Sequence, residues 1–267
     1  MRTVKLLVTA MITATAIAGC GDESDTMDNN ASVPTVSAAP TVVQDAAKKL
    51  TAAAEKTATT TFRYRAADPS AGGTIEGDTD PKAPASTATM TIDLDAENKL
   101  TFQSIAAGGA FYLKISGLPS TGGTDLSKYW LKADPAKITG SLGLLDAKDP
   151  IDVKAILNQA SNVKSDDGAL YTGTLDLSTT TTDGLLFDTD AAKQLGDKAK
   201  SVPFSASVNP DGYVSGVRIS VPAYGTEAAS ESSVTLLGFG SPVDATAPTG
   251  TQVMNMPEQM YTVLNAQ

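Results

Sequence analysis

The chain has 267 residues, with 30 Asp and Glu against 20 Lys and Arg, one Cys and no His. The absence of His removes the usual general base of catalytic triads and the commonest zinc ligand, and a single Cys forms neither an internal disulfide nor a thiolate cage. The formal net charge of −10 repels phosphate backbones and anionic headgroups, so we predict no nucleic-acid partner and no electrostatic attachment to membranes.

The first 19 residues have the pattern of an export signal peptide. Arg2 and Lys5 form a short basic region, and the apolar run from Leu6 to Ala18 is too short for a membrane span. The run leads into Ile17-Ala18-Gly19-Cys20, which resembles the bacterial lipobox, whose Cys receives a diacylglycerol before cleavage on its amino side. The alternative is an ordinary cleaved signal followed by an accidental Cys. We expect a lipoprotein whose palmitate-type acyl chains on Cys20 anchor it to the extracytoplasmic face of the cell membrane.

Residues 20–41 form the predicted tether. They are rich in Asp, Asn, Ser and Thr and have almost no large apolar side chain, so this segment has no core to bury. Its acidic residues lack the glycine and the terminal Glu of a calcium loop, which favours a solvated tether over a metal site. We predict no metal and no cofactor, and one folded domain over 42–267.

The folded domain is predicted to begin with a helix and to continue with strands. From 42 to 57 apolar residues recur at helical spacing, and from 59 to 66 Phe62 and Tyr64 alternate with Arg63 and Arg65. After a loop predicted over 68–85, alternation predicts further strands at 89–94, 100–103, 111–116, 129–133, 171–177, 202–208, 217–221 and 234–239. Tyr112 is expected on the solvated face of its strand.

Two further helices are predicted between these strands. Asp149-Pro150 provides an N-cap and a first-turn proline for a helix that reaches Ala160, and a weaker helical pattern covers 190–200. About nine strands and two or three helices indicate an α+β fold with one large, curved antiparallel sheet. We expect the helices to cover the concave, apolar face of that sheet.

Catalytic motifs are scarce. Carboxylate pairs occur at 78 and 80, 93 and 95, 166 and 167, and 188 and 190, but each lies in or beside a predicted turn, where Asp accepts hydrogen bonds from the nearby backbone. The sequence contains no Gly-x-Ser-x-Gly elbow, Walker loop or dinucleotide fingerprint. We therefore predict that the chain is not an enzyme. A hydrolase is the third hypothesis, which carboxylates converging in a cleft would favour.

Several segments, taken in order, resemble one family. They are the lipobox, the helix followed by a strand, Tyr129-Trp130-Leu131-Lys132-Ala133-Asp134-Pro135, the stretch from Leu144 to Val163, the strand around 171–176, and Val202-Pro203-Phe204 through Asn209-Pro210-Asp211-Gly212 to Pro222. In these segments the chain is similar to the LppX/LprG-type actinobacterial cell-envelope lipoproteins, whose fold is similar to the lipoprotein carrier LolA. The resemblance implies a half-open antiparallel barrel with helices over its concave side. It also implies a non-catalytic lipoprotein that binds and transports acylated lipids or glycolipids in an apolar cavity.

The alternation of apolar and polar residues selects candidates for the lining of such a cavity, between the sheet and the helices. These candidates are Met90, Ile92, Leu94, Phe102, Leu113, Ile115, Val153, Ile156, Leu157, Leu175, Phe204, Val217 and Ile219. The opposing hypothesis is a sensory or interaction module of the same fold, in which side chains fill the core and the surface contacts another envelope protein. An open apolar tunnel would distinguish the first hypothesis from the second.

Overall fold

The computed structural model describes residues 40–68, 73–83, 85–93, 98–117, 125–138, 151, 153–180, 186–187 and 189–265. The predicted signal peptide, Cys20, nearly all of the tether, Leu94 and Asp149-Pro150 lie outside these residues. What the sequence predicts for them therefore stays a prediction.

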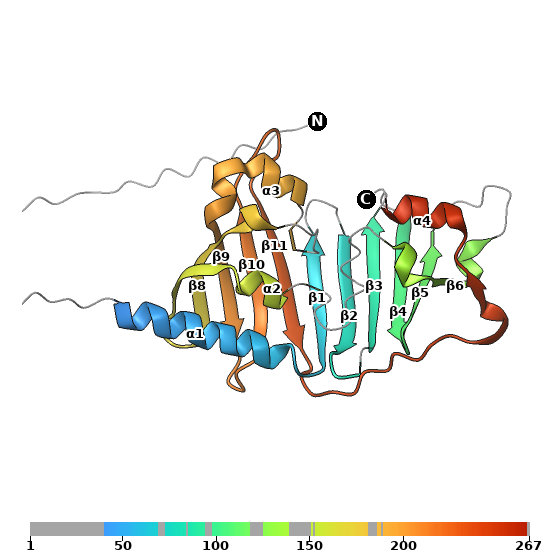
Figure 1. The fold of residues 1–267 in the computed structure, drawn as a ribbon, viewed down its shortest axis with the longest axis horizontal. Helices are drawn as coiled ribbons and strands as arrows, with labels where there is room; N and C mark the ends of the chain where they lie inside the picture. Colours follow the sequence, from blue (N-terminus) through green and yellow to red (C-terminus); the bar gives the residue numbers. More distant parts are fainter. Residues whose placement is uncertain are drawn as a thin grey trace, which may run out of the picture. The chain divides into compact units, whose positions relative to one another are not determined.

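One sheet of twelve strands dominates the described residues (Figure 1). Its order is β12-β6-β5-β4-β3-β2-β1-β11-β10-β9-β8-β7, and neighbouring strands are antiparallel except for β12 with β6. Two meanders, β1 to β6 and β7 to β11, meet where β1 pairs with β11. The strands are β1 (Phe62–Asp68), β2 (Gly73–Asp80), β3 (Ala85–Asp93), β4 (Lys99–Ala107), β5 (Ala110–Ser116), β6 (Trp130–Ala133), β7 (Ala160–Lys164), β8 (Leu170–Leu175), β9 (Val202–Val208), β10 (Val214–Val221), β11 (Ser230–Leu237) and β12 (Val253–Asn255).

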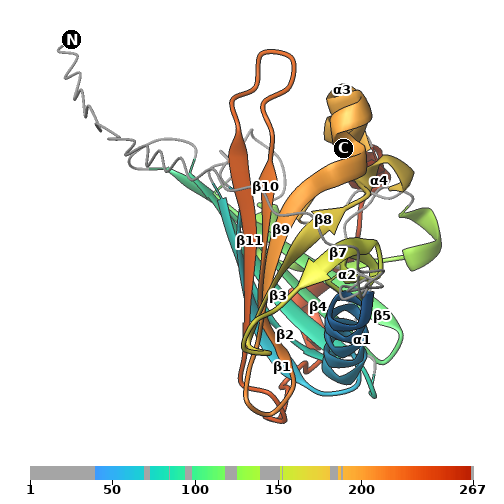
Figure 2. The ribbon, with the colours of Figure 1, turned by 90° about the vertical axis from the view of Figure 1, so that its left-hand side faces the viewer.

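Four α-helices of the described residues lie on the concave side of the curved sheet (Figure 2). They are α1 (Pro40–Thr57), α2 (Val153–Leu157), α3 (Thr189–Leu195) and α4 (Glu258–Asn265). Short 3₁₀ segments cover Leu126–Lys128, Pro135–Lys137, Leu177–Thr179, Gly196–Ser201 and Gly250–Gln252. The predicted α+β class and the large, mostly antiparallel sheet are confirmed, and the sheet is open, with β12 and β7 at its two ends.

The helix α1 forms because small apolar residues repeat along one of its faces. Leu50 and Ala54 on that face are buried, whereas Lys48 beside it is exposed. The apolar face packs against α2, β7 and β10. At the end of the helix, Thr57 Oγ1 accepts a hydrogen bond of 2.9 Å from Val214 N and so connects α1 to β10. The helix predicted over 42–57 is confirmed, and it starts two residues earlier.

The inner face of the sheet carries two separate clusters of buried apolar side chains. The first cluster lies under α1, α2 and α3, and its strand residues come from β1 to β3 and β7 to β11. The second cluster lies under α4. It comprises Phe111, Leu113, Ile115, Leu131, Ala133, Met256 and Tyr261.

Residues 73–80, predicted as part of a loop, form the strand β2. The segment contains one large apolar residue, Ile75, and its other inward positions are Gly77 and Thr79, so no apolar alternation indicates a strand. Gly77 is small because Tyr64 of β1 lies over it, and a Cβ at Gly77 would meet Tyr64 Oη at 2.6 Å. The partners of β2, rather than its own sequence, therefore specify it.

The helix predicted to reach Ala160 ends at Leu157, and Ala160 begins the strand β7. This strand was missed because Val163 is its one buried residue, Asn162 has a φ of 52°, and the register with β8 shifts. The helix predicted over 190–200 is α3 followed by a 3₁₀ segment. The last predicted strand, over 234–239, ends at Leu237.

The predicted counts of about nine strands and two or three helices are too low. The strands β2, β7 and β12 and the helix α4 account for the additional elements. Tyr112 is also buried instead of solvated, because it lies between Ile105 of β4 and Lys132 of β6 in the register of the outer face. Long neighbouring side chains cover an aromatic ring there without a second layer.

Candidate functional site

The predicted cavity residues do not form one group. Those in the first cluster are Val153, Ile156, Leu157, Leu175, Phe204, Val217 and Ile219, and Met90 packs against it. Those in the second cluster are Leu113 and Ile115, and Phe102 packs against it. Ile92 is described but is a member of neither cluster, and Leu94 lies outside the described residues. The alternation thus identified inward-facing residues, but it did not show that the helices divide these residues between two clusters.

Most of these side chains are packed against others. Leu175, Val217 and Ile219, for example, are fully buried. Four large apolar side chains in the middle of the inner face differ, because they are only half-buried. They are Met90 and Ile92 of β3 and, directly opposite them on β4, Phe102 and Leu100. We call these four residues the apolar strip. Met90 packs against the first cluster, and Leu100 and Phe102 pack against the second.

The three cavities described in the structure lie away from the apolar strip. One, of about 550 Å³, lies on the outer face of the sheet over β1, β2, β3 and β11. Another, of about 500 Å³, lies between α1 and the turns that precede β8 and β10. The third, of about 530 Å³, lies between α4 and Lys137. None of these three is lined by a predicted cavity residue.

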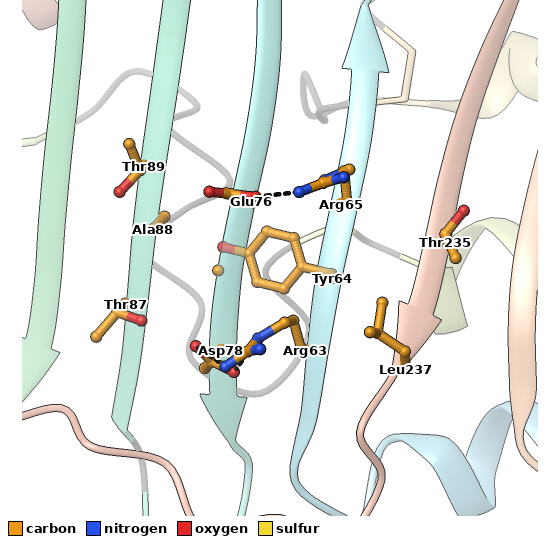
Figure 3. A pocket seen from close by; sticks show the side chains of 11 residues that line it. Arg63, Tyr64, Arg65, Glu76, Asp78, Thr87, Ala88, Thr89, Thr235 and Leu237 are labelled. Atoms are coloured by element: carbon orange, nitrogen blue, oxygen red, sulfur yellow. Dashed lines mark hydrogen bonds and ion pairs between the residues drawn. The ribbon is translucent and has the colours of Figure 1, made fainter.

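Two cross-strand ion pairs line the outer-face cavity (Figure 3). Arg63 Nε lies 3.0 Å from Asp78 Oδ1, and Arg65 Nη2 lies 2.8 Å from Glu76 Oε2. Both arginines are largely exposed, so each pair stabilises the fold by about 1 kcal/mol at most. Because the paired charges cancel, these residues offer no excess charge to an ionic ligand.

Tyr64 lies next to the same cavity. Figure 3 shows its ring extending from β1 toward β2, between the two ion pairs. Its hydroxyl is fully buried and has no hydrogen-bond partner in the part of the chain that the structure describes. Burial, with a smaller contribution from the negative charge of Asp78, raises the pKa of this hydroxyl above its usual value. Tyr64 therefore stays neutral and acts in packing rather than in acid–base chemistry.

No protein-family model and no curated protein matches this chain. Within the described ranges, His, Cys, Asp and Glu form no group of three or more that could hold a metal ion. Among the helices of these ranges, none combines the length and the hydropathy that a membrane-spanning segment needs.

The residues that cover the second cluster were missed by the sequence analysis. Met256 and Tyr261, before and within α4, are both buried. The available signal was Pro257-Glu258, a typical helix start, followed by Met260 and Tyr261. A helix of eight residues is too short to give a clear hydrophobic period, so this signal was too weak to find.

The Tyr64→Phe variant is expected to be as stable as the parent or more stable by about 1 kcal/mol, because it removes a buried hydroxyl without a partner and keeps the ring. Tyr261→Phe is the control. There, Asp134 N loses the acceptor that lies 2.7 Å away, and the free energy of unfolding should fall by about 1 kcal/mol. Urea unfolding of both variants measures the difference.

The same pair of variants has an expected pH dependence. The pKa of Tyr64 is raised in the folded state, whereas a tyrosine in the unfolded chain has a pKa of about 10. The parent therefore loses stability as the pH rises above about 10, because the unfolded chain then releases this proton more readily than the folded protein does. Tyr64→Phe should remove this alkaline loss. Equal losses of stability in the two variants at neutral pH would show that the Tyr64 hydroxyl has a partner.

Proposed function

We propose that the chain is a lipid-anchored, non-catalytic protein of the cell envelope that binds acylated lipids or glycolipids and transfers them at the extracytoplasmic face of the membrane. In this proposal the sheet is a half-open barrel similar to that of the LolA carrier. Cys20 carries the anchor, and the concave face of the sheet holds the acyl chains. The lipobox and the resemblance to LppX/LprG-type lipoproteins support the anchor and the class of ligand.

The apolar strip is the observation that carries this proposal. Large apolar side chains on the inner face of an antiparallel sheet are normally covered by the opposing layer, but these four stay half-buried. A contiguous apolar surface that is incompletely covered is typical of a site for an apolar ligand. Each methylene that a ligand buries there contributes about 0.8 kcal/mol, so a short acyl segment gains substantial affinity from contact with the strip.

A second candidate function is an interaction module with a closed core. The full burial of Leu175, Val217 and Ile219 favours it, because these predicted wall residues pack as an ordinary core does. In that case the ligand would be another envelope protein, and the concave face would take up no lipid. Lipid uptake by the purified protein therefore separates the two candidates.

The Ile92→Lys variant is expected to bind a dansyl-labelled fatty acid about tenfold more weakly than the parent, because an acyl chain on the strip would have to desolvate the new charge. Ile92 is half-buried and outside both clusters, so the melting temperature should change little. Fluorescence titration of the chain from residue 21 onward, purified without detergent, measures the affinity. Native mass spectrometry of the same material detects lipid carried through purification.

Leu237→Lys is the matched control for this substitution. Leu237 is an apolar strand residue that is 43% exposed, and it lies on the outer face of the sheet. Its replacement should leave probe binding unchanged. A parent protein that carries no lipid and binds no probe would overturn the proposed function and leave the interaction module as the better candidate.

A further inference from the structure

Residues 253–265 are attached to the sheet differently from the rest of the fold. After β11, residues 238–249 contain no helix or strand, and Figure 1 shows this connection passing below the ends of the strands of the first meander toward β6. β12 is three residues long and pairs with β6 in parallel, whereas the other neighbouring strands are antiparallel. Parallel pairing is less stable per residue, and three residues supply few hydrogen bonds.

Polar contacts connect α4 to residues 134–137, and Tyr261 of α4 also packs in the second cluster. Tyr261 Oη accepts a hydrogen bond of 2.7 Å from Asp134 N, and Asn265 Nδ2 donates one of 2.9 Å to Lys137 O. Lys137 and Glu258 form an ion pair whose two side chains are substantially exposed. The surface hollow of about 530 Å³ lies beside this ion pair.

The inner surface beside the apolar strip is also apolar where it passes beneath α4. The register places Met90 opposite Phe102, and Phe102 opposite Ile115. On the next pair of strands, Leu113 lies opposite Leu131. Four strands, β3 to β6, thus share one apolar inner surface about 14 Å wide, since neighbouring strands are about 4.8 Å apart. Met256 and Tyr261 cover the far half of this surface.

We infer that the inner surface of β5 and β6 is an acyl-chain site and that residues 253–265 are its displaceable cover. The inference rests on the proposed function, because it extends the lipid surface from the strip to the second cluster. The buried side chains of the cover, Met256 and Tyr261, occupy the place of the ligand. An acyl chain that enters from the strip would displace them and meet Phe111, Leu113 and Leu131, which have no charged group among them.

The Glu258→Lys variant tests the cover, because it turns the ion pair with Lys137 into a repulsion. It should bind a dansyl-labelled fatty acid about five- to tenfold more tightly than the parent, since a larger fraction of molecules then has the site open. The matched control is Glu231→Lys, which reverses the same charge in the Arg218–Glu231 pair of β10 and β11. This control should bind the probe as the parent does.

Two further variants keep the test decisive. Tyr261→Phe weakens the same cover without a change of charge, so it should also increase affinity if Glu258→Lys folds poorly. Ile115→Trp added to Glu258→Lys should abolish the gain, because the indole fills the surface beneath α4. If the parent binds the probe and neither cover variant binds it more tightly, residues 253–265 are not a displaceable cover, and the proposed function stays intact. Absence of binding in the parent and in all cover variants would overturn both.

Discussion

Cys20→Ala is expected to reduce the incorporation of a labelled fatty acid into the protein to background. The chain has one Cys, and the proposed anchor requires its thiolate, so no second position can replace it. For fractionation, the predicted signal peptide of the variant is replaced by a cleavable export signal that directs no lipid attachment. The variant should then move from the membrane fraction to the soluble fraction. Two or more acyl chains give stable attachment to a bilayer, and the acidic chain has no excess positive charge to substitute for them.

Metabolic labelling and fractionation after a high-salt wash measure these two effects. Ser24→Ala is the control, since it lies in the same predicted tether and leaves Cys20 in place. It should retain both the label and the membrane fraction. Label that persists in Cys20→Ala would contradict the proposal that Cys20 is lipidated. An unlabelled variant that stays with the membrane would show another mode of attachment.

Gly77→Ala is expected to destabilise the folded protein by about 3 kcal/mol, the upper end of the typical cost of overpacking, because the site has no room to relax. A Cβ at this position would lie 2.1 Å from Thr87 O and 2.6 Å from Tyr64 Oη. The first atom belongs to the backbone of β3 and the second to a fully buried side chain, so neither moves aside easily. The strands β1, β2 and β3 would have to separate.

Gly216→Ala in β10 is the matched control, because it makes the same change within a strand. Its Cβ would meet Val234 O at 3.4 Å, an ordinary contact, and the free energy of unfolding should change by less than about 1 kcal/mol. Urea unfolding gives both values. In the double variant Gly77→Ala/Tyr64→Ala, part of the loss should disappear, since the phenol is then absent. Similar stabilities for Gly77→Ala and Gly216→Ala would contradict the close packing of Tyr64 on β2.

The strands that the sequence predicts correctly are those that carry their own alternation. Phe62 and Tyr64 point inward while Arg63 and Arg65 point outward, as the pattern in β1 indicates. In β2 the inward positions include Gly77 and Thr79, and the ring of Tyr64 from β1 fills the space over Gly77. The identity of those residues depends on a partner, and no local pattern contains that information.

The candidate site is predictable to a similar extent. Alternation found inward-facing residues such as Ile115 and Ile219, and both are buried. It did not separate the second cluster from the first, because that division depends on where α4 and the other helices pack. Nor did it distinguish the half-buried Met90 and Ile92 from the fully buried Val217. Exposure depends on the extent of the opposing layer, which is a tertiary property.

The pairing of β1 with β11 also bears on how the chain assembles. The other antiparallel neighbours in the sheet are consecutive strands of the chain, so each meander forms through local contacts. The pairing of β1 with β11, in contrast, joins residues far apart in the sequence, such as Arg63 and Leu237. Closing so long a loop costs entropy that local hairpins avoid, and this pairing should therefore form late. Until then the edge of β1 has unpaired backbone groups, and the apolar face of α1 lacks β7 and β10. The elements synthesised first are thus among the last to be covered, which makes the first meander the aggregation-prone part of the chain during folding.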